Sequence, residues 1–229
     1  METIRCQARL AGALYALVAI VGPISLIYIP GQVFAPGAAP ADHIRASEGL
    51  LRLGIASELF YQSVEVFLVL ALYALFKPVN AGLARQMAVL GLMPIPIVLA
   101  NLLNEIAALM MAHGAGAIGG LPKPMADSLA AGFLLLHGRG LEVAAVFWGL
   151  WLFPLGLLVI RCGFIPKLLG VLAMIAGAGY VIGSVVSLAA PQYGPSLGAA
   201  ASMLELGELP IIAWLLLAGA RPARTAPSA

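Results

Sequence analysis

The chain contains 229 residues, 62% of them hydrophobic and only 10% charged, and its formal net charge is +2. Soluble domains carry about 25% charged residues, so this composition excludes a water-soluble globular protein and indicates a membrane protein. The small net charge predicts no nucleic-acid partner.

Six apolar segments follow one another along the chain. Each is long enough for a helix across the roughly 30 Å of hydrocarbon in a bilayer, and a helix satisfies its own backbone hydrogen bonds there. We therefore expect a single all-α transmembrane domain over residues 1–229, a polytopic helix bundle with six spans. The expected spans are about Leu10–Ile29, Leu50–Phe76, Gln86–Met111, Ser128–Ile160, Ile165–Ala189 and Leu197–Ala218.

Prolines and glycines mark the places where these helices are expected to deviate from a straight course. In the third span, Pro94 and Pro96 predict a kink, because proline has no backbone N–H to donate. The fourth span is unusually long and contains the run His137–Gly140 as well as Pro154. Its glycine pair leaves two alternatives open, one long helix or an interfacial piece followed by the true span.

The distribution of Lys and Arg between the two sides predicts the orientation. One side carries eight basic residues and the other three. We expect the richer side and both termini to be cytoplasmic, in the plasma or inner membrane, with a short disordered C-terminal tail at 221–229. Cys6 and Cys162 then lie on the reducing side, where no disulfide is expected. The eight are Arg5, Arg9, Lys77, Arg85, Arg161, Lys167, Arg221 and Arg224, and the three are Arg45, Arg52 and Lys123.

Polar residues inside the expected spans are the candidates for function, since a charge in hydrocarbon is costly and usually faces the protein interior. Six of the ten acidic residues lie within spans. At 1.5 Å per residue, most of these polar groups fall about 12–22 Å along the helix from the outer end, and Glu65 lies nearer mid-membrane. We therefore predict one polar cavity in the outer half of the bundle. Its predicted ligand-binding residues are Glu58, Glu65, Asn101, Glu105, His137, Arg139, Glu142, Glu205 and Glu208.

Spacing within the helices predicts local pairs among these residues. Glu58 and Glu65 are seven residues apart and share a helix face. Arg139 and Glu142 are three apart, which allows an ion pair within one helix. Asn101 is more typical of an interhelical hydrogen bond than of a ligand contact.

The balance of charge within the spans favours a cationic ligand. Six carboxylates face one arginine and one histidine, and burying unpaired anions costs several kcal/mol each. The first hypothesis is therefore that the cavity binds or transports a cation, a proton or a small cationic molecule. The second is an intramembrane, lipid-modifying enzyme with Glu and His as acid–base groups. The third is a structural or accessory membrane protein, and no cofactor, catalytic residue or oligomeric state is predicted.

No metal site is predicted from the sequence. The chain has three histidines, and only His137 lies in an expected span, which argues against a three-histidine zinc site. The Glu-x-x-His motifs of carboxylate-rich di-metal bundles do not occur in the sequence. Cys6 and Cys162 are too isolated to form a metal or redox motif.

Several short runs resemble the DUF4386 family of bacterial membrane proteins, and the likeness covers nearly the whole chain. The resemblance implies a multi-pass helical membrane protein and carries no activity with it. The runs are ARLAG at 8–12, LFKPVN at 75–80, HGRG at 137–140, FWGLWLFPLG at 147–156 and GFIPKLLGVL at 163–172.

Overall fold

The computed structural model describes residues 2–33, 40–113 and 120–220, and every regular element in this part of the chain is a helix. Six helical stretches are long and apolar enough to cross a membrane, which confirms the predicted all-α, six-span bundle. The predicted tail at 221–229, with Arg221 and Arg224, lies outside the described residues. The six stretches are Thr3–Val33, Glu48–Phe76, Ala81–Ala112, Lys123–Cys162, Lys167–Ala189 and Ser196–Leu217.

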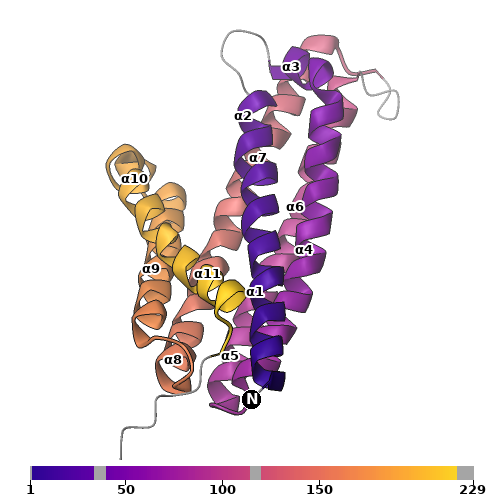
Figure 1. Cartoon of the computed structure of the whole chain (residues 1–229). Coiled ribbons are helices and arrows are strands. Elements are labelled where there is room, and N and C mark those ends of the chain that lie inside the picture. Colours follow the sequence, from indigo (N-terminus) through magenta and orange to yellow (C-terminus); the bar gives the residue numbers. More distant parts are fainter. Residues whose placement is uncertain (1, 34–39, 114–119, 221–229) are drawn as a thin grey trace, which may run out of the picture.

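The chain runs up and down the bundle, so that the start of α1, the α4–α5 and α8–α9 turns and the end of α11 share one end, called here the N-terminal end (Figure 1). The short helix α3 lies at the opposite end, the α3 end. In chain order the elements are α1 (Glu2–Pro23), the π-helix η1 (Ile24–Tyr28), α2 (Ile29–Val33), α3 (Pro40–Ala46), α4 (Glu48–Phe76), α5 (Ala81–Leu92), α6 (Pro94–Ala112), α7 (Lys123–Leu150), α8 (Leu152–Cys162), α9 (Lys167–Ala189), the 3-10 helix η2 (Pro191–Tyr193), α10 (Gly194–Glu205), the 3-10 helix η3 (Leu206–Glu208) and α11 (Leu209–Leu217).

Prolines interrupt the spans within the turn that precedes them, because proline donates no hydrogen bond to the carbonyl four residues earlier. The third span divides at Met93, whose N–H donates to the Leu90 carbonyl at 3.3 Å, so the helix is interrupted where Pro94 and Pro96 predicted a kink. The sixth span divides in the same way at η3, just before Pro210. Sequence reasoning did not predict this second break.

The fourth span resolves the alternative left open by its glycine pair. Helix α7 continues without interruption through His137–Gly140 and ends at Leu150, and α8 begins at Leu152. The break therefore lies at Trp151, three residues before Pro154, and not at the glycines. Glycine lowers helix propensity by about 1 kcal/mol, whereas proline removes a hydrogen bond and clashes with the preceding turn.

Glycines at the interface of α7 and α8 with α9 allow the two backbones to touch. A Cβ added to Gly149 would lie 2.6 Å from the Gly177 carbonyl, and one added to Gly156 would lie 2.5 Å from the Gly170 carbonyl. The reciprocal additions at Gly177 and Gly170 would be equally tight. Small residues drive such close packing between membrane helices.

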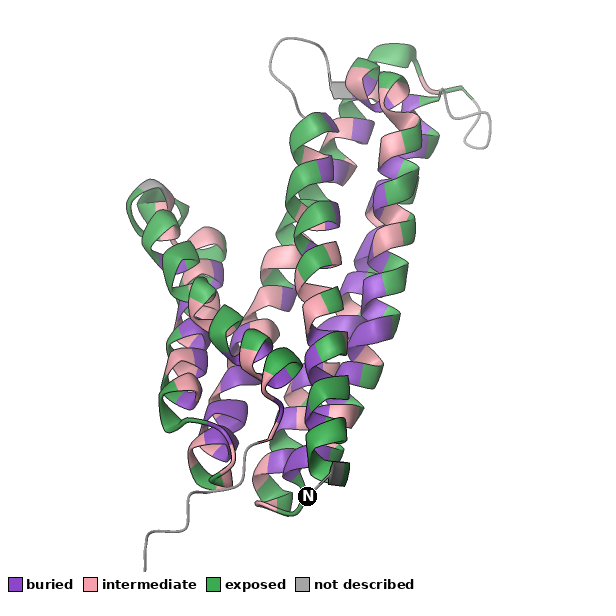
Figure 2. Cartoon of the chain, viewed as in Figure 1, coloured by how far each residue is buried: buried purple, intermediate pink, exposed green. Residues whose placement is uncertain are grey.

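Two apolar cores hold the bundle together, and both are lined by the inward faces of the helices (Figure 2). The larger lies toward the N-terminal end and includes Leu72, Phe76 and Leu155. The smaller lies toward the α3 end and includes Ile44 and Leu134. The outward faces carry large apolar side chains exposed to the surroundings, which suits a lipid solvent.

Arg45 fastens α3 to the end of α6 by a hydrogen bond and to the start of α7 by an ion pair. Arg45 donates to Asp127 at 2.9 Å and to the Ala112 carbonyl at 2.5 Å, and it also pairs with Asp42. The hydrogen bond with Asp127, followed by the one with Asp42, raises the pKa of Arg45. The charged arginine, which is protonated at any physiological pH, thus joins the three helix ends.

Candidate functional site

Three of the predicted site residues meet inside the bundle, each from a different helix. Glu58 comes from α4, Glu105 from α6 and His137 from α7, and their exposed fractions are 0%, 2% and 4%. His137 Nε2 lies 3.3 Å from Glu58 Oε1 and 3.6 Å from Glu105 Oε1. One potential ligand atom from each residue lies within 4.8 Å of the others. These residues are called here the Glu58 cluster.

The carboxylates of the Glu58 cluster have fewer partners than they can accept. Among the described residues, His137 is the ion-pair partner of both, and neither pairs with Lys or Arg. Glu58 Oε2 and Glu105 Oε2 are buried and accept no hydrogen bond from the described part of the chain. Two buried acids around one imidazole leave a site that favours added positive charge, because an uncompensated buried anion is strongly destabilising.

The depth of the cluster follows from the position of Glu58 in α4, ten residues after Glu48. That separation corresponds to about 15 Å along a helix. Glu58 is therefore well inside the span Glu48–Phe76 and closer to the α3 end than to the N-terminal end.

Asparagines on α6 hold His137 in place. Asn101 Nδ2 donates to the His137 carbonyl at 2.8 Å, and the Asn101 carbonyl lies 3.3 Å from His137 Nδ1. Asn104 Nδ2 in turn donates to Asn101 Oδ1 at 2.8 Å. The prediction that Asn101 makes an interhelical hydrogen bond is thus confirmed.

Gly140 lets α6 approach α7 at this point. A Cβ added there would lie 2.7 Å from Asn101 Nδ2 and nearer still to its Oδ1. The neighbouring Gly138 has nothing within 4 Å of such an atom. The second glycine of the run therefore supports the asparagine contact to His137, whereas the first does not.

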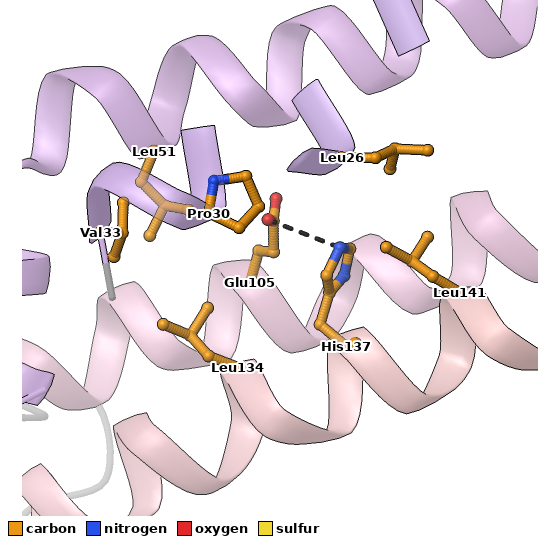
Figure 3. A pocket seen from close by; sticks show the side chains of 9 residues that line it. Leu26, Pro30, Val33, Leu51, Glu105, Leu134, His137 and Leu141 are labelled. Atoms are coloured by element: carbon orange, nitrogen blue, oxygen red, sulfur yellow. Dashed lines mark ion pairs between the residues drawn. The ribbon is translucent and has the colours of Figure 1, made fainter. Parts of the chain in front are cut away.

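A small cavity of about 70 Å³ adjoins the cluster (Figure 3). Glu105 and His137 form its polar wall, and the dashed line in Figure 3 marks their ion pair. Leu26 reaches the cavity from the π-helix η1, a type of distortion that is frequent at functional sites. The other lining residues are Pro30, Val33, Leu51, Leu134, Gly138 and Leu141.

Two more of the predicted acids, Glu65 and Glu208, belong to a second group called here the Glu208 cluster. Tyr15 of α1 donates a hydrogen bond to Glu208 Oε1, and the Tyr180 hydroxyl of α9 bonds the same carboxylate. Glu65 of α4, 5% exposed, interacts electrostatically with Glu208. Sequence reasoning missed both tyrosines because it considered charged groups and amides, although a phenol at membrane depth also needs a partner.

The remaining predicted residues lie outside both clusters. Arg139 is exposed and donates to Ser187 of α9, to the carbonyl at 3.2 Å and to Oγ at 3.1 Å. The Arg139 side chain is therefore positioned by Ser187 of α9, and not by the expected ion pair with Glu142. Glu142 and Glu205 are half-buried and repel each other electrostatically. The residues expected to line one cavity are instead divided among two clusters and a peripheral group.

Buried polar residues between Glu58 and Glu65 were also missed from the sequence. Tyr61 and Gln62 are 2% and 0% exposed and lie on the inward face of α4. A helix face repeats every three to four residues, so their spacing from Glu58 was the signal that could have found them.

Comparison with known proteins assigns the chain to a family. A curated relative from Archaeoglobus fulgidus, described as an uncharacterized protein, is 34% identical over 79 residues, which is 34% of this chain and 46% of the relative. The chain thus covers about half the length of that relative. No solved structure matches this chain. The model of the family described as a domain of unknown function, DUF4386, matches residues 10–219. With its six membrane-spanning helices, the chain is a multi-pass membrane protein that belongs to the DUF4386 family.

Proposed function

We propose that this protein binds a cation within the membrane, at the Glu58 cluster. The observation that carries the proposal is the pair of buried carboxylate oxygens, Glu58 Oε2 and Glu105 Oε2, that accept no hydrogen bond from the described residues. A buried anion without donors is costly, and a bound cation offsets that cost. The small cavity beside Glu105 and His137 supports the proposal, because it offers space for a ligand or its water.

The proposed orientation places the site in the outer half of a plasma or inner membrane. The N-terminal end carries Arg5, Arg9, Lys77, Arg85, Arg161 and Lys167 near the ends of its helices. Cytoplasmic loops are rich in Lys and Arg, so we place this end in the cytoplasm and the α3 end outside. The Glu58 cluster then lies in the outer half of the bundle.

The test is the melting temperature of the detergent-purified protein with a panel of cations. The panel contains monovalent and divalent metal ions and small amines, and protons are varied through the pH. A ligand that binds only the folded state raises the melting temperature by mass action. We expect a saturable rise with at least one cation, lost in Glu58→Gln and Glu105→Gln. Both substitutions keep the shape of the side chain and remove its charge.

Glu142→Gln is the matched control, since Glu142 is a half-buried carboxylate outside the cluster. It should keep the response of the natural chain. If no cation changes the melting temperature of the natural chain, or if Glu142→Gln removes the response as fully as Glu58→Gln, the proposed site is wrong.

A further inference from the structure

Building on the proposed cation site, we propose that its ligand is a divalent transition-metal ion of the zinc type. The ion is held by His137 Nε2 and by one carboxylate oxygen each from Glu58 and Glu105. This set assembles one imidazole and two carboxylates, the donors that zinc and related ions take in proteins.

The spacing of the donor atoms suits such an ion. Zinc binds nitrogen and oxygen at about 2.0–2.2 Å in a tetrahedron, which puts neighbouring donor atoms about 3.3–3.6 Å apart. His137 Nε2 lies 3.3 Å from Glu58 Oε1 and 3.6 Å from Glu105 Oε1. One potential ligand atom from each of the three residues lies within 4.8 Å of the others, so small side-chain adjustments would bring all three donors to one ion.

The contacts on the far side of the His137 ring, at Nδ1, are compatible with those of a metal ligand. A metal-bound histidine usually donates its other ring N–H to a carbonyl or carboxylate, which fixes the tautomer and the ring plane. The Asn101 carbonyl lies 3.3 Å from Nδ1, and the Asn101 side chain holds the His137 backbone at 2.8 Å. The side-chain amide nitrogen of Asn101 lies 3.2 Å from the same Nδ1, so Nδ1 has a partner in either tautomer. Metal binding selects the tautomer with the proton on Nδ1, in which the Nε2 lone pair faces the two carboxylates.

A fourth coordination position is available on the cavity side. Three protein ligands plus a water is the composition of catalytic zinc sites, whereas structural sites are closed by four protein ligands. The cavity of about 70 Å³ adjoins Glu105 and His137 and is otherwise lined by apolar residues, and a water occupies about 30 Å³ of liquid volume. The position therefore accommodates one or two waters.

Other cations suit the site less well. Calcium requires six to eight oxygen ligands, and magnesium requires six in an octahedron, but the cluster supplies two carboxylates and a nitrogen. An organic amine would have to fit within the small, largely aliphatic cavity. A protonated His137 between two carboxylates is the metal-free alternative, and the experiment distinguishes it.

The test measures bound metal in the full-length protein in detergent, after removal of any affinity tag and treatment with a chelator. Equilibrium dialysis against Zn²⁺ or Co²⁺, followed by elemental analysis, gives the number of ions per chain. Co²⁺ also gives a visible absorption spectrum that reports the donors and the coordination number. We expect one ion per chain and a tetrahedral or five-coordinate Co²⁺ spectrum.

Variants assign the donors. His137→Gln and Glu58→Gln should weaken binding at least 100-fold, and Glu105→Asp, which retains a carboxylate, should weaken it less. His113→Gln is the matched control, because His113 pairs with Glu48 outside the cluster. It should bind like the natural chain. A melting temperature in the absence of metal that is close to that of the natural chain shows that a variant is folded.

The outcomes separate this inference from the proposed function. If Zn²⁺ and Co²⁺ do not bind but protons, monovalent ions or amines shift the melting temperature through Glu58, the cluster binds a cation and the metal assignment is wrong. If no cation binds at all, both proposals fail. Metal binding that persists in His137→Gln and Glu58→Gln but is lost in His113→Gln would also overturn the assignment.

Discussion

The two acidic clusters place similar carboxylates in different surroundings. In the Glu208 cluster, the hydroxyl groups of Tyr15 and Tyr180 satisfy the Glu208 carboxylate from two neighbouring helices. Glu65 of the same cluster has one buried oxygen, Oε2, that accepts no hydrogen bond from the described residues. In the Glu58 cluster, one imidazole lies between two carboxylates, and three of their four oxygens, both of Glu58 and Oε2 of Glu105, accept none from the described part of the chain.

We infer from this difference that the number of hydrogen-bond donors around a buried acid, more than burial itself, separates a structural carboxylate from one that can bind a ligand. A carboxylate that accepts hydrogen bonds is stabilised in place, whereas one without donors carries a desolvation cost that a ligand can offset. The Glu208 carboxylate therefore links helices, and the Glu58 cluster is the better candidate for binding.

The largest expected effect tests this contrast directly. Glu58→Gln should abolish the melting-temperature rise produced by the bound cation and lower affinity at least 100-fold, because it removes one of two anionic groups. Glu208→Gln should change the affinity less than about threefold, which is under 1 kcal/mol. Thermal titrations of both variants give the comparison, and equal losses would mean that the two clusters form one site.

A smaller effect on cation affinity is expected from the contact between Gly140 and Asn101, the residue that positions His137. Gly140→Ala places a Cβ against the Asn101 side chain and should displace it from His137, with about a 10- to 100-fold loss of cation affinity, as for other partners of metal ligands. Gly138→Ala is the control, since an added Cβ meets nothing within 4 Å. Titration of the two variants under identical conditions checks the prediction. Equal affinities would show that Asn101 does not position the histidine.

Substitutions in the Glu208 cluster should lower the stability of the protein and leave its cation binding unchanged. Tyr15→Phe removes a donor to Glu208 and should lower the free energy of unfolding by about 1–3 kcal/mol, the cost of leaving a buried acceptor unsatisfied. The cation-induced rise in melting temperature should remain. Chemical denaturation in detergent measures the first quantity and a thermal titration the second. A loss of the cation response with unchanged stability would reverse the assigned roles.

The smallest effect is expected at the periphery of both clusters. Arg139→Ala removes two hydrogen bonds to Ser187 on α9. Interhelical hydrogen bonds in membrane proteins average about 0.6 kcal/mol, so stability should fall by that order and cation affinity should be unchanged. Denaturation and titration of the variant check both statements. A tenfold change in affinity would place Arg139 in the binding site.

Some features of the fold follow from the sequence by local rules. The six spans were predictable because each apolar run exceeds the length that a bilayer requires. The break before Pro94 was predictable because the missing N–H acts within one turn of the proline. The sites of the other two breaks, at Trp151 and at η3, obey the same rule but were not anticipated.

The composition of the candidate site was only partly predictable. Glu58, Glu105 and His137 were identified as polar groups at membrane depth, and the structure brings them together. Glu208, Glu142 and Arg139 were identified by the same argument and lie elsewhere. Spacing within a helix gives the face on which a residue lies, but it does not give the neighbour that this face meets.

The sequence by itself determined that the chain is a six-span membrane bundle and which ionisable groups lie within the spans, because hydrophobic length and charge are local properties. Tertiary structure decided which of these groups share a site. That choice depends on how far each helix is rotated and shifted against its neighbours, and close contacts such as Gly140 on Asn101 and Gly149 on Gly177 set both quantities. A mixed site of one histidine and two glutamates from α4, α6 and α7 has no sequence-local motif, so only the packed helices reveal it.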